Sequence, residues 1–86
     1  MTFWLYVLVN PQKDIYIGQT SQLEIRLAQH NDPEYRGTLH TKRHPGPWKL
    51  IHEEQFDTRG EAMRRERELK GSRGRTWIRQ QFEIGC

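Results

Sequence analysis

Cysteine is almost missing from this chain of 86 residues, in which Cys86 is the single example. One thiol cannot form an internal disulfide, so the fold must depend on its hydrophobic core. A lone cysteine is also more typical of a reducing cytoplasm than of a secreted, disulfide-rich scaffold. We therefore expect a cytoplasmic protein.

Apolar residues are also few, at 34% of the chain. No apolar run approaches the roughly 20 residues that span a membrane. The apolar start, Met1–Val9, is too short for a signal peptide and lacks its basic leader. We expect one domain over residues 1–86, without a membrane anchor and near the lower size limit for a self-sufficient core.

The four histidines do not form a pattern typical of a zinc site. No cysteine pair accompanies His30, His40, His44 and His52, and their spacing is not a tight ligand motif. His40 and His44 stand four apart, but Pro45 argues against a helix there. We expect no zinc centre.

Positive charge is concentrated in the last third of the chain. The whole chain has a net charge of +3, whereas residues 59–79 hold eight basic residues against three acids, a net charge of +5. Most of these basic residues are arginines, whose planar fork suits phosphate oxygens. The segment is either an electrostatic footprint for nucleic acid or a solvated helix face, and charge alone does not decide between them.

The first eighteen residues predict a β-hairpin. Phe3–Val9 is nearly all apolar, as in a strand buried on both faces, and Ile15–Gly18 is a second short strand. The turn-forming residues 10–14 lie between them. A loop with an odd number of residues pairs even-numbered strand positions with even-numbered ones, and odd with odd. Tyr6 and Tyr16 would then lie on the same face of the sheet.

A helix and a third strand follow. Ser21 and Glu24 form a capping box that predicts a helix with Leu23 on its buried face, ending near Asn31. The polar stretch Glu34–Pro47 predicts a mobile loop or a strand entrance, and its length favours a functional role. Residues 48–56 are typical of a strand, with Trp48 and Leu50 on one face.

The last part of the chain predicts two helices. Thr58 and Glu61 form a second capping box, and Ala62, Glu66 and Leu69 then share one face of a helix that ends at Gly71. Ser72 is the expected cap of a final helix, whose buried stripe comprises Trp77, Ile78, Gln81 and Phe82. The order β-β-α-β-α-α predicts an α+β sandwich, a small three-stranded antiparallel sheet flanked by helices.

Glu66 is the one acid in a position that the pattern reserves for an apolar side chain. On the preceding helix, Arg26 and His30 stand four residues apart and are therefore neighbours on its surface. Each of these three residues has an ordinary alternative role. Glu66 can be a solvated surface carboxylate, Arg26 a solvent-facing arginine, and His30 a partner of the helix dipole. Tyr6 and Tyr16 can likewise be core aromatics of their strands, with their hydroxyls at the rim of the core.

Taken together, these residues resemble the GIY-YIG nuclease superfamily. Trp4-Leu5-Tyr6 stands where the first motif lies, and Tyr16-Ile17-Gly18 matches the second. The stretches 40–43 and 47–50 are similar to those of small stand-alone members. Trp4 replaces the first glycine of the motif. Many members also carry an asparagine after the glutamate, and this chain has none after Asn31, so another residue supplies that group or it is absent.

The resemblance implies a role for each residue. Tyr6 would be the general base. Because a phenol has an ordinary pKa of about 10, a cation or a neighbouring donor would have to lower it, and Tyr16 or a metal-bound water could help. Tyr16 would orient the site, Arg26 would contact the scissile phosphate, and His30 would orient or share the base role. Glu66 would hold Mg²⁺ or Mn²⁺ opposite the two phenols, in one pocket. The expected nucleic-acid contacts are Gly18, Lys42, Arg65, Lys70 and Arg73.

The function that this resemblance implies is a divalent-metal-dependent endonuclease acting on DNA, on structured or damaged duplex, in repair or recombination. Two alternatives stay open. One is a nucleic-acid-binding module with weak or no catalysis, which the missing asparagine and the arginine-rich last third favour. The other is a nuclease subunit that needs a protein partner, or a homodimer, because so short a chain offers little recognition surface.

Overall fold

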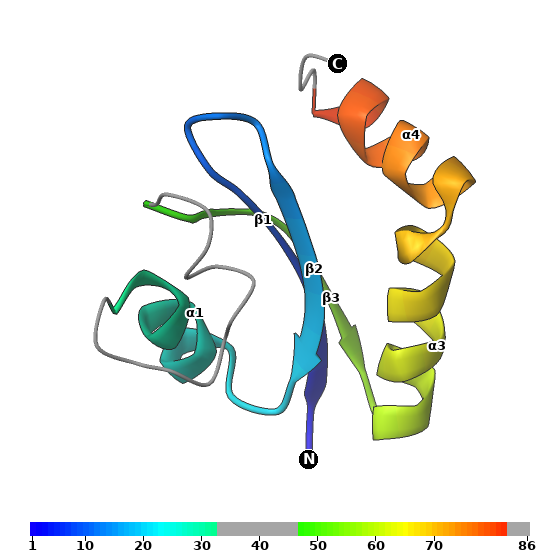
Figure 1. Ribbon diagram of the computed structural model, residues 1–86. Coiled ribbons are helices and arrows are strands. Elements are labelled where there is room, and N and C mark those ends of the chain that lie inside the picture. The colour runs from blue at the N-terminus through cyan, green and yellow to red at the C-terminus, as the bar shows by residue number, and fades with distance from the viewer. Residues whose placement is uncertain (33–46, 83–86) are drawn as a thin grey trace.

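The computed structural model describes residues 1–32 and 47–82. Its elements in chain order are β1 (Phe3–Val9), β2 (Ile15–Thr20), α1 (Leu23–Asn31), β3 (Lys49–Phe56), α3 (Arg59–Lys70) and α4 (Ser72–Gln81). Figure 1 shows α1 on one face of the sheet and α3 and α4 on the other. The predicted order and fold class are confirmed. Lys42 and nearly all of the predicted 34–47 loop lie outside the described residues.

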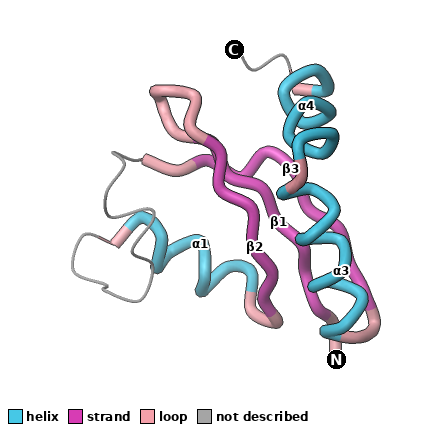
Figure 2. Tube along the Cα trace, turned by 45° about the vertical axis from the view of Figure 1, so that its right-hand side comes forward, coloured by secondary structure: helices cyan, strands magenta, loops and turns pink. Residues whose placement is uncertain are grey.

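Strand β1 lies at the centre of the antiparallel sheet, whose order is β2-β1-β3. Its side chains alternate between the two helical layers, which lie on either side of the sheet (Figure 2). Leu5 and Val7 face α3 and α4, whereas Tyr6 and Leu8 face α1. This double burial explains why the strand is almost wholly apolar and confirms the prediction from its sequence.

The hairpin register places both tyrosines on the α1 face. Val9 pairs with Ile15 and closes a five-residue loop, so that Tyr16 opposes Leu8 and Gly18 opposes Tyr6. The predicted register, in which even-numbered residues pair with even-numbered ones, is therefore confirmed. Strand β2 continues to Thr20, two residues beyond its predicted end at Gly18.

The buried Asn10 side chain organises the hairpin loop. Its Oδ1 accepts hydrogen bonds from the backbone N–H groups of Gln12, at 3.1 Å, and Asp14, at 2.8 Å. Lys13 completes the loop in the left-handed region, with a φ of 68°. The loop geometry therefore sets the strand register, because each backbone donor at the turn has a defined partner.

Two hydrophobic clusters lie on opposite faces of the sheet. The cluster under α3 and α4 comprises Leu5, Val7, Ile17, Leu69 and Ile78. The cluster under α1 comprises Tyr6, Leu8 and Trp48, with Tyr16, Leu23, Leu27 and Leu50 packed around them. None of the helices in the described part of the chain is long and apolar enough to cross a bilayer.

The helix starts are partly as predicted. Thr58 caps α3 as expected, since its Oγ1 accepts from the backbone N–H of Glu61 at 3.2 Å. The prediction for Ser21 was wrong: β2 extends to Thr20, whose Oγ1 accepts from the N–H of Gln22 at 3.0 Å, and Gln22 is the N-cap.

The start and the buried face of α4 also differ from the prediction. Gly71 ends α3 and is also the N-cap of α4, so Ser72 is the first helical residue rather than the cap. Of the predicted stripe, Ile78 is buried and Phe82 is half-buried, but Trp77 is 37% exposed. Gln81 is also exposed.

A side-chain amide ties the end of α1 to the start of β3. Asn31 Nδ2 donates to the Trp48 carbonyl at 3.0 Å, and the Trp48 N–H donates to Asn31 Oδ1 at 2.7 Å. These two bonds join residues 17 apart in the chain. They therefore hold the end of α1, where His30 is located, against the sheet.

Candidate active site

The centre of the candidate site is a hydrogen bond between a strand phenol and a helix imidazole. Tyr6 Oη lies 2.8 Å from His30 Nε2, although the two residues are 24 apart in sequence. Both side chains are buried, at 1% and 3% exposure. His30 belongs to the last turn of α1, and that helix packs Leu23 and Leu27 against the Tyr6 face. The structure thus brings together two of the predicted site residues.

Tyr16 adds a third ring to this cluster. Its ring centroid lies 4.6 Å from that of His30 and 6.1 Å from that of Tyr6. Tyr16 is half-buried, so it is the most accessible of the three rings. The predicted pair of tyrosines on one face is therefore found beside the predicted histidine.

Gly18 makes room for these rings. A Cβ at this position would lie 2.7 Å from Tyr6 Oη and 3.0 Å from Tyr16 Cε1, closer than atoms pack. Its φ is not positive, so the demand for glycine is steric. Gly18 is itself buried, and its predicted contact with nucleic acid stays a prediction.

Burial raises the pKa of the Tyr6 phenol well above its ordinary value, and the neighbouring Tyr16 raises it further. The Arg26 guanidinium, which stabilises the phenolate through charge and hydrogen bonding, lowers the pKa but does not outweigh burial. Tyr6 therefore keeps its proton near neutral pH. The prediction that Tyr16 helps to lower this pKa was wrong, because Tyr16 raises it, and the lowering group is Arg26, whose effect is the smaller one.

Arg26 lies one turn before His30 on α1, and it is half-buried. Its Nη1 donates to Gln29 Oε1 at 3.1 Å. Because Arg26 also influences the Tyr6 hydroxyl, it connects the buried cluster with the polar surface at the end of β2. This is the position from which a guanidinium can bind a phosphate beside the rings.

Glu66 lies on the other side of the sheet. It shares the inward stripe of α3 with the buried Ala62 and Leu69, and its side chain is 22% exposed, which confirms the predicted stripe position. Arg59, about two turns earlier on the same flank of the helix, contacts Gln19 of β2. Glu66 therefore lies on the flank of α3 that meets β2, whereas the rings belong to the cluster under α1, and these two helices cover opposite faces of the sheet (Figure 1). The prediction that Glu66 lies opposite the two phenols in one pocket is thus not borne out.

The Glu66 carboxylate forms an ion pair with Lys70, whose Nζ lies 2.7 Å from Oε2. Among the described residues, no group of three or more His, Cys, Asp or Glu side chains could hold a metal ion. A single carboxylate fits a hard cation such as Mg²⁺, which often takes one or two carboxylates and completes its shell with water and phosphate. These residues therefore fit a cation held in part by substrate rather than a closed protein cage.

The other predicted nucleic-acid contacts are spread over the molecule. Arg65 Nε donates to both carboxylate oxygens of Glu54 on β3, at 3.0 and 3.1 Å, and its Nη1 lies 3.3 Å from Glu68. Lys70 is engaged with Glu66, and Arg73 is exposed on α4. None of these is part of the ring cluster, and their contacts with nucleic acid stay predictions.

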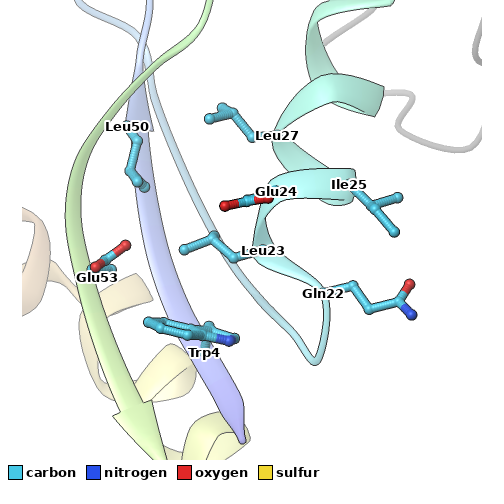
Figure 3. A pocket seen from close by; sticks show the side chains of 8 residues that line it. All are labelled: Trp4, Gln22, Leu23, Glu24, Ile25, Leu27, Leu50 and Glu53. Carbon is cyan, nitrogen blue, oxygen red and sulfur yellow. The ribbon is translucent and has the colours of Figure 1, made fainter.

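An apolar groove extends along the α1 face beside the rings. Figure 3 shows Trp4 of β1 and Leu50 of β3 across from Leu23 of α1, with Glu24 and Glu53 also lining the groove. Its volume is about 530 Å³. The apolar walls and the two carboxylates make this groove unsuited to a phosphate backbone. A polyanion is therefore expected to approach elsewhere.

The sheet flanked by helices, with two tyrosines, an arginine and a histidine on one face, is the framework of a nuclease catalytic domain. Residues 2–79 match the family model described as the GIY-YIG catalytic domain, and the chain belongs to this family. The family is one of nucleases, which act on nucleic acid and generally use a divalent metal.

Similar proteins belong to a small group within the same family. A UPF0213 protein of Staphylococcus haemolyticus is 36% identical over 78 residues, which cover 91% of this chain and 85% of the relative. One from Natronomonas pharaonis is 37% identical over 67 residues, covering 78% and 75%. The solution NMR structure of a UPF0213 protein from Bacillus halodurans superposes with a TM-score of 0.56 at 27% identity, covering 99% of this chain and 88% of that one.

Two contacts between elements were not predicted from the sequence. Arg59 and Gln19, which meet at the edge of β2, were not singled out, although Arg59 opens the basic segment. The pairing of Tyr6 with His30 was not predicted as a contact either. No local pattern could have indicated it, because the two residues belong to different elements.

Proposed function

We propose that this protein is a divalent-metal-dependent endonuclease that hydrolyses phosphodiester bonds in DNA, with structured or damaged duplex as its substrate and repair or recombination as its setting. We also propose that the whole chain is one catalytic domain acting in the cytoplasm. The observation that carries the proposal is the hydrogen bond of 2.8 Å between Tyr6 and His30, beside Tyr16 and Arg26, in a member of a nuclease family.

The Tyr6–His30 pair supports a proton relay. Because burial raises the pKa of Tyr6, the phenol cannot act as a preformed phenolate. It can act as a base only if its proton moves to His30 Nε2 while its oxygen takes a proton from the attacking water. This transfer requires the histidine tautomer with its proton on Nδ1. Water and phosphate would reach the pair past Tyr16, which is half-buried whereas Tyr6 and His30 are buried.

Arg26 and Glu66 would supply the electrostatics. The Arg26 guanidinium would bind the scissile phosphate, whose negative charge grows as the water attacks. Glu66, released from Lys70, would hold Mg²⁺ or Mn²⁺, which when bound supplies Lewis-acid stabilisation of the phosphoryl and leaving oxygens. The residues from both faces of the sheet would meet on a substrate that crosses the edge of β2.

A plasmid-nicking assay with Mg²⁺ or Mn²⁺ tests the proposal. We expect Glu66→Gln to lower the nicking rate on the order of 10²-fold or more, because it removes the single charged ligand without changing side-chain size. Glu68→Gln is the matched control, since this glutamate lies on the same helix with 56% side-chain exposure, and it should keep the wild-type rate. Equal residual nicking by wild type and Glu66→Gln would refute the assignment.

The second candidate is a binding module without cleavage. It is favoured by the ion pair of 2.7 Å between Glu66 and Lys70, which occupies the expected metal ligand. Salt-dependent DNA binding with no nicking under either metal would support it. A requirement for a protein partner, or for a homodimer, would instead appear as nicking that is restored by a co-purifying protein or that depends on protein concentration.

A further inference from the structure

A polar pocket lies at the outer edge of β2, between the start of α1 and the start of α3. Its volume is about 310 Å³, and its walls come from the end of β2, the turn after it, α1 and the first residue of α3. Arg26 contributes to it from α1 and Arg59 from α3. Gln19 and Gln29 add side-chain amides, and none of the described residues that line it is acidic.

Arg59 is held in place by neutral groups. Its Nη1 donates to Gln19 Oε1 at 3.2 Å, and its guanidinium carbon lies 4.9 Å from the centroid of the Phe3 ring. Neither the amide nor the ring neutralises the positive charge, and Arg59 is exposed. The guanidinium is thus both oriented and available to an anion, which lowers the entropy cost of binding one.

The electrostatic contrast with the apolar groove indicates which ligand this pocket takes. The groove carries Glu24 and Glu53, whereas the pocket at the β2 edge combines two guanidinium groups with amides. Arginine forks and amide N–H groups are the donors that phosphate oxygens accept from. The pocket is open rather than enclosed, as a site for one phosphate in a polymer must be.

The geometry points to a second phosphate-binding subsite at Arg59, for a phosphate next to the scissile one at Arg26 on the same DNA strand. The strand would cross the edge of β2 from the ring cluster to the Glu66 flank of α3. Arg59 and Glu66 lie seven residues apart on that flank, about 10 Å along the helix axis. A phosphate at Arg59 would thus direct the strand towards both halves of the site. This subsite rests on the proposed function for its ligand, DNA.

The test is the salt dependence of DNA binding without cleavage. Affinity of the full chain for a fluorescein-labelled duplex is measured in EDTA at several salt concentrations, by fluorescence anisotropy. We expect Arg59→Gln to weaken binding and to reduce the slope of log affinity against log salt by about 0.9, the value for one lost phosphate contact. Arg59→Lys, which keeps the charge, should restore most of the slope.

Arg64→Gln is the matched control, because Arg64 is exposed on the same helix and lines none of these pockets. An equal drop in slope for Arg59→Gln and Arg64→Gln would overturn the inference, since binding would then follow net charge alone. No change in slope for Arg59→Gln would overturn it as well. Failure of the proposed function looks different: nicking is absent or insensitive to Glu66→Gln, while the binding difference between Arg59→Gln and Arg64→Gln remains.

Discussion

Adding one methyl group at Gly18 should disturb the candidate site directly, because the new carbon would meet the Tyr6 ring. The Cβ of Gly18→Ala would lie 2.7 Å from Tyr6 Oη and 2.8 Å from Tyr6 Cζ, about 0.7 Å closer than the shortest ordinary contact of 3.4 Å. The Tyr6 ring cannot simply swing away, because it is 1% exposed and hydrogen-bonded to His30. The strand or the ring must therefore shift.

We expect this overpacking to cost about 1–3 kcal/mol of the free energy of unfolding. For a chain of this length, that lowers the melting temperature by roughly 4–8 °C per kcal/mol. If the proposed function holds, the nicking rate should also fall, by up to about 10²-fold, because the Tyr6–His30 pair is displaced by a large fraction of an ångström. Chemical denaturation and plasmid nicking measure the two effects.

Gly60→Ala is the control, because a Cβ at this position in α3 meets nothing within 4 Å. Replacing a glycine in an exposed helix position should stabilise the protein by about 0.5–1 kcal/mol. The two substitutions therefore have opposite expected signs for the same chemical change. If Gly18→Ala unfolds at the wild-type denaturant concentration, the inferred contact of the Tyr6 ring with Gly18 is wrong.

Two further predictions concern the buried cluster and the end of α1. Above about pH 10 an unfolded tyrosine ionises while Tyr6 stays protonated, so the folded state binds more protons and stability falls with rising pH, by about 1.4 kcal/mol per unit. Tyr6→Phe should flatten that fall in alkaline denaturation curves, and an unchanged pH slope would contradict the raised pKa. Asn31→Ala removes both hydrogen bonds to Trp48 and should cost about 1–3 kcal/mol in denaturant unfolding. Asn31→Asp keeps the acceptor, so its free energy of unfolding should lie between those of wild type and Asn31→Ala. Equal stability of all three proteins would show that the amide does not hold α1 to β3.

Much of the fold follows from local patterns in the sequence. The five-residue loop of the hairpin sets the register that brings Tyr6 and Tyr16 to one face, because strand side chains alternate with a period of two. The Thr58 cap and the inward position of Glu66 follow from hydrogen bonding and periodicity within a single helix. These features depend on residues a few positions apart.

Capping failed as a predictor where sheet pairing competed with it. Thr20 pairs with Trp4, so β2 continues almost to the helix and Ser21 is left in the turn. At Ser72, the preceding helix ends so close that Gly71 serves both elements. A partner on another strand thus displaced the first cap, whereas the end of the adjacent helix displaced the second.

The sequence by itself determined the element order, the faces of the strands and the family, and it supplied the candidate site residues, because these follow from short-range periodicity and from motifs. Only the tertiary structure decided that Tyr6 bonds His30, that Arg59 meets Gln19, and that Glu66 and the rings lie on opposite faces of the sheet. Each of these relations involves residues on different elements. Packing of α1 and α3 against the sheet sets their distances, and no local pattern contains that information.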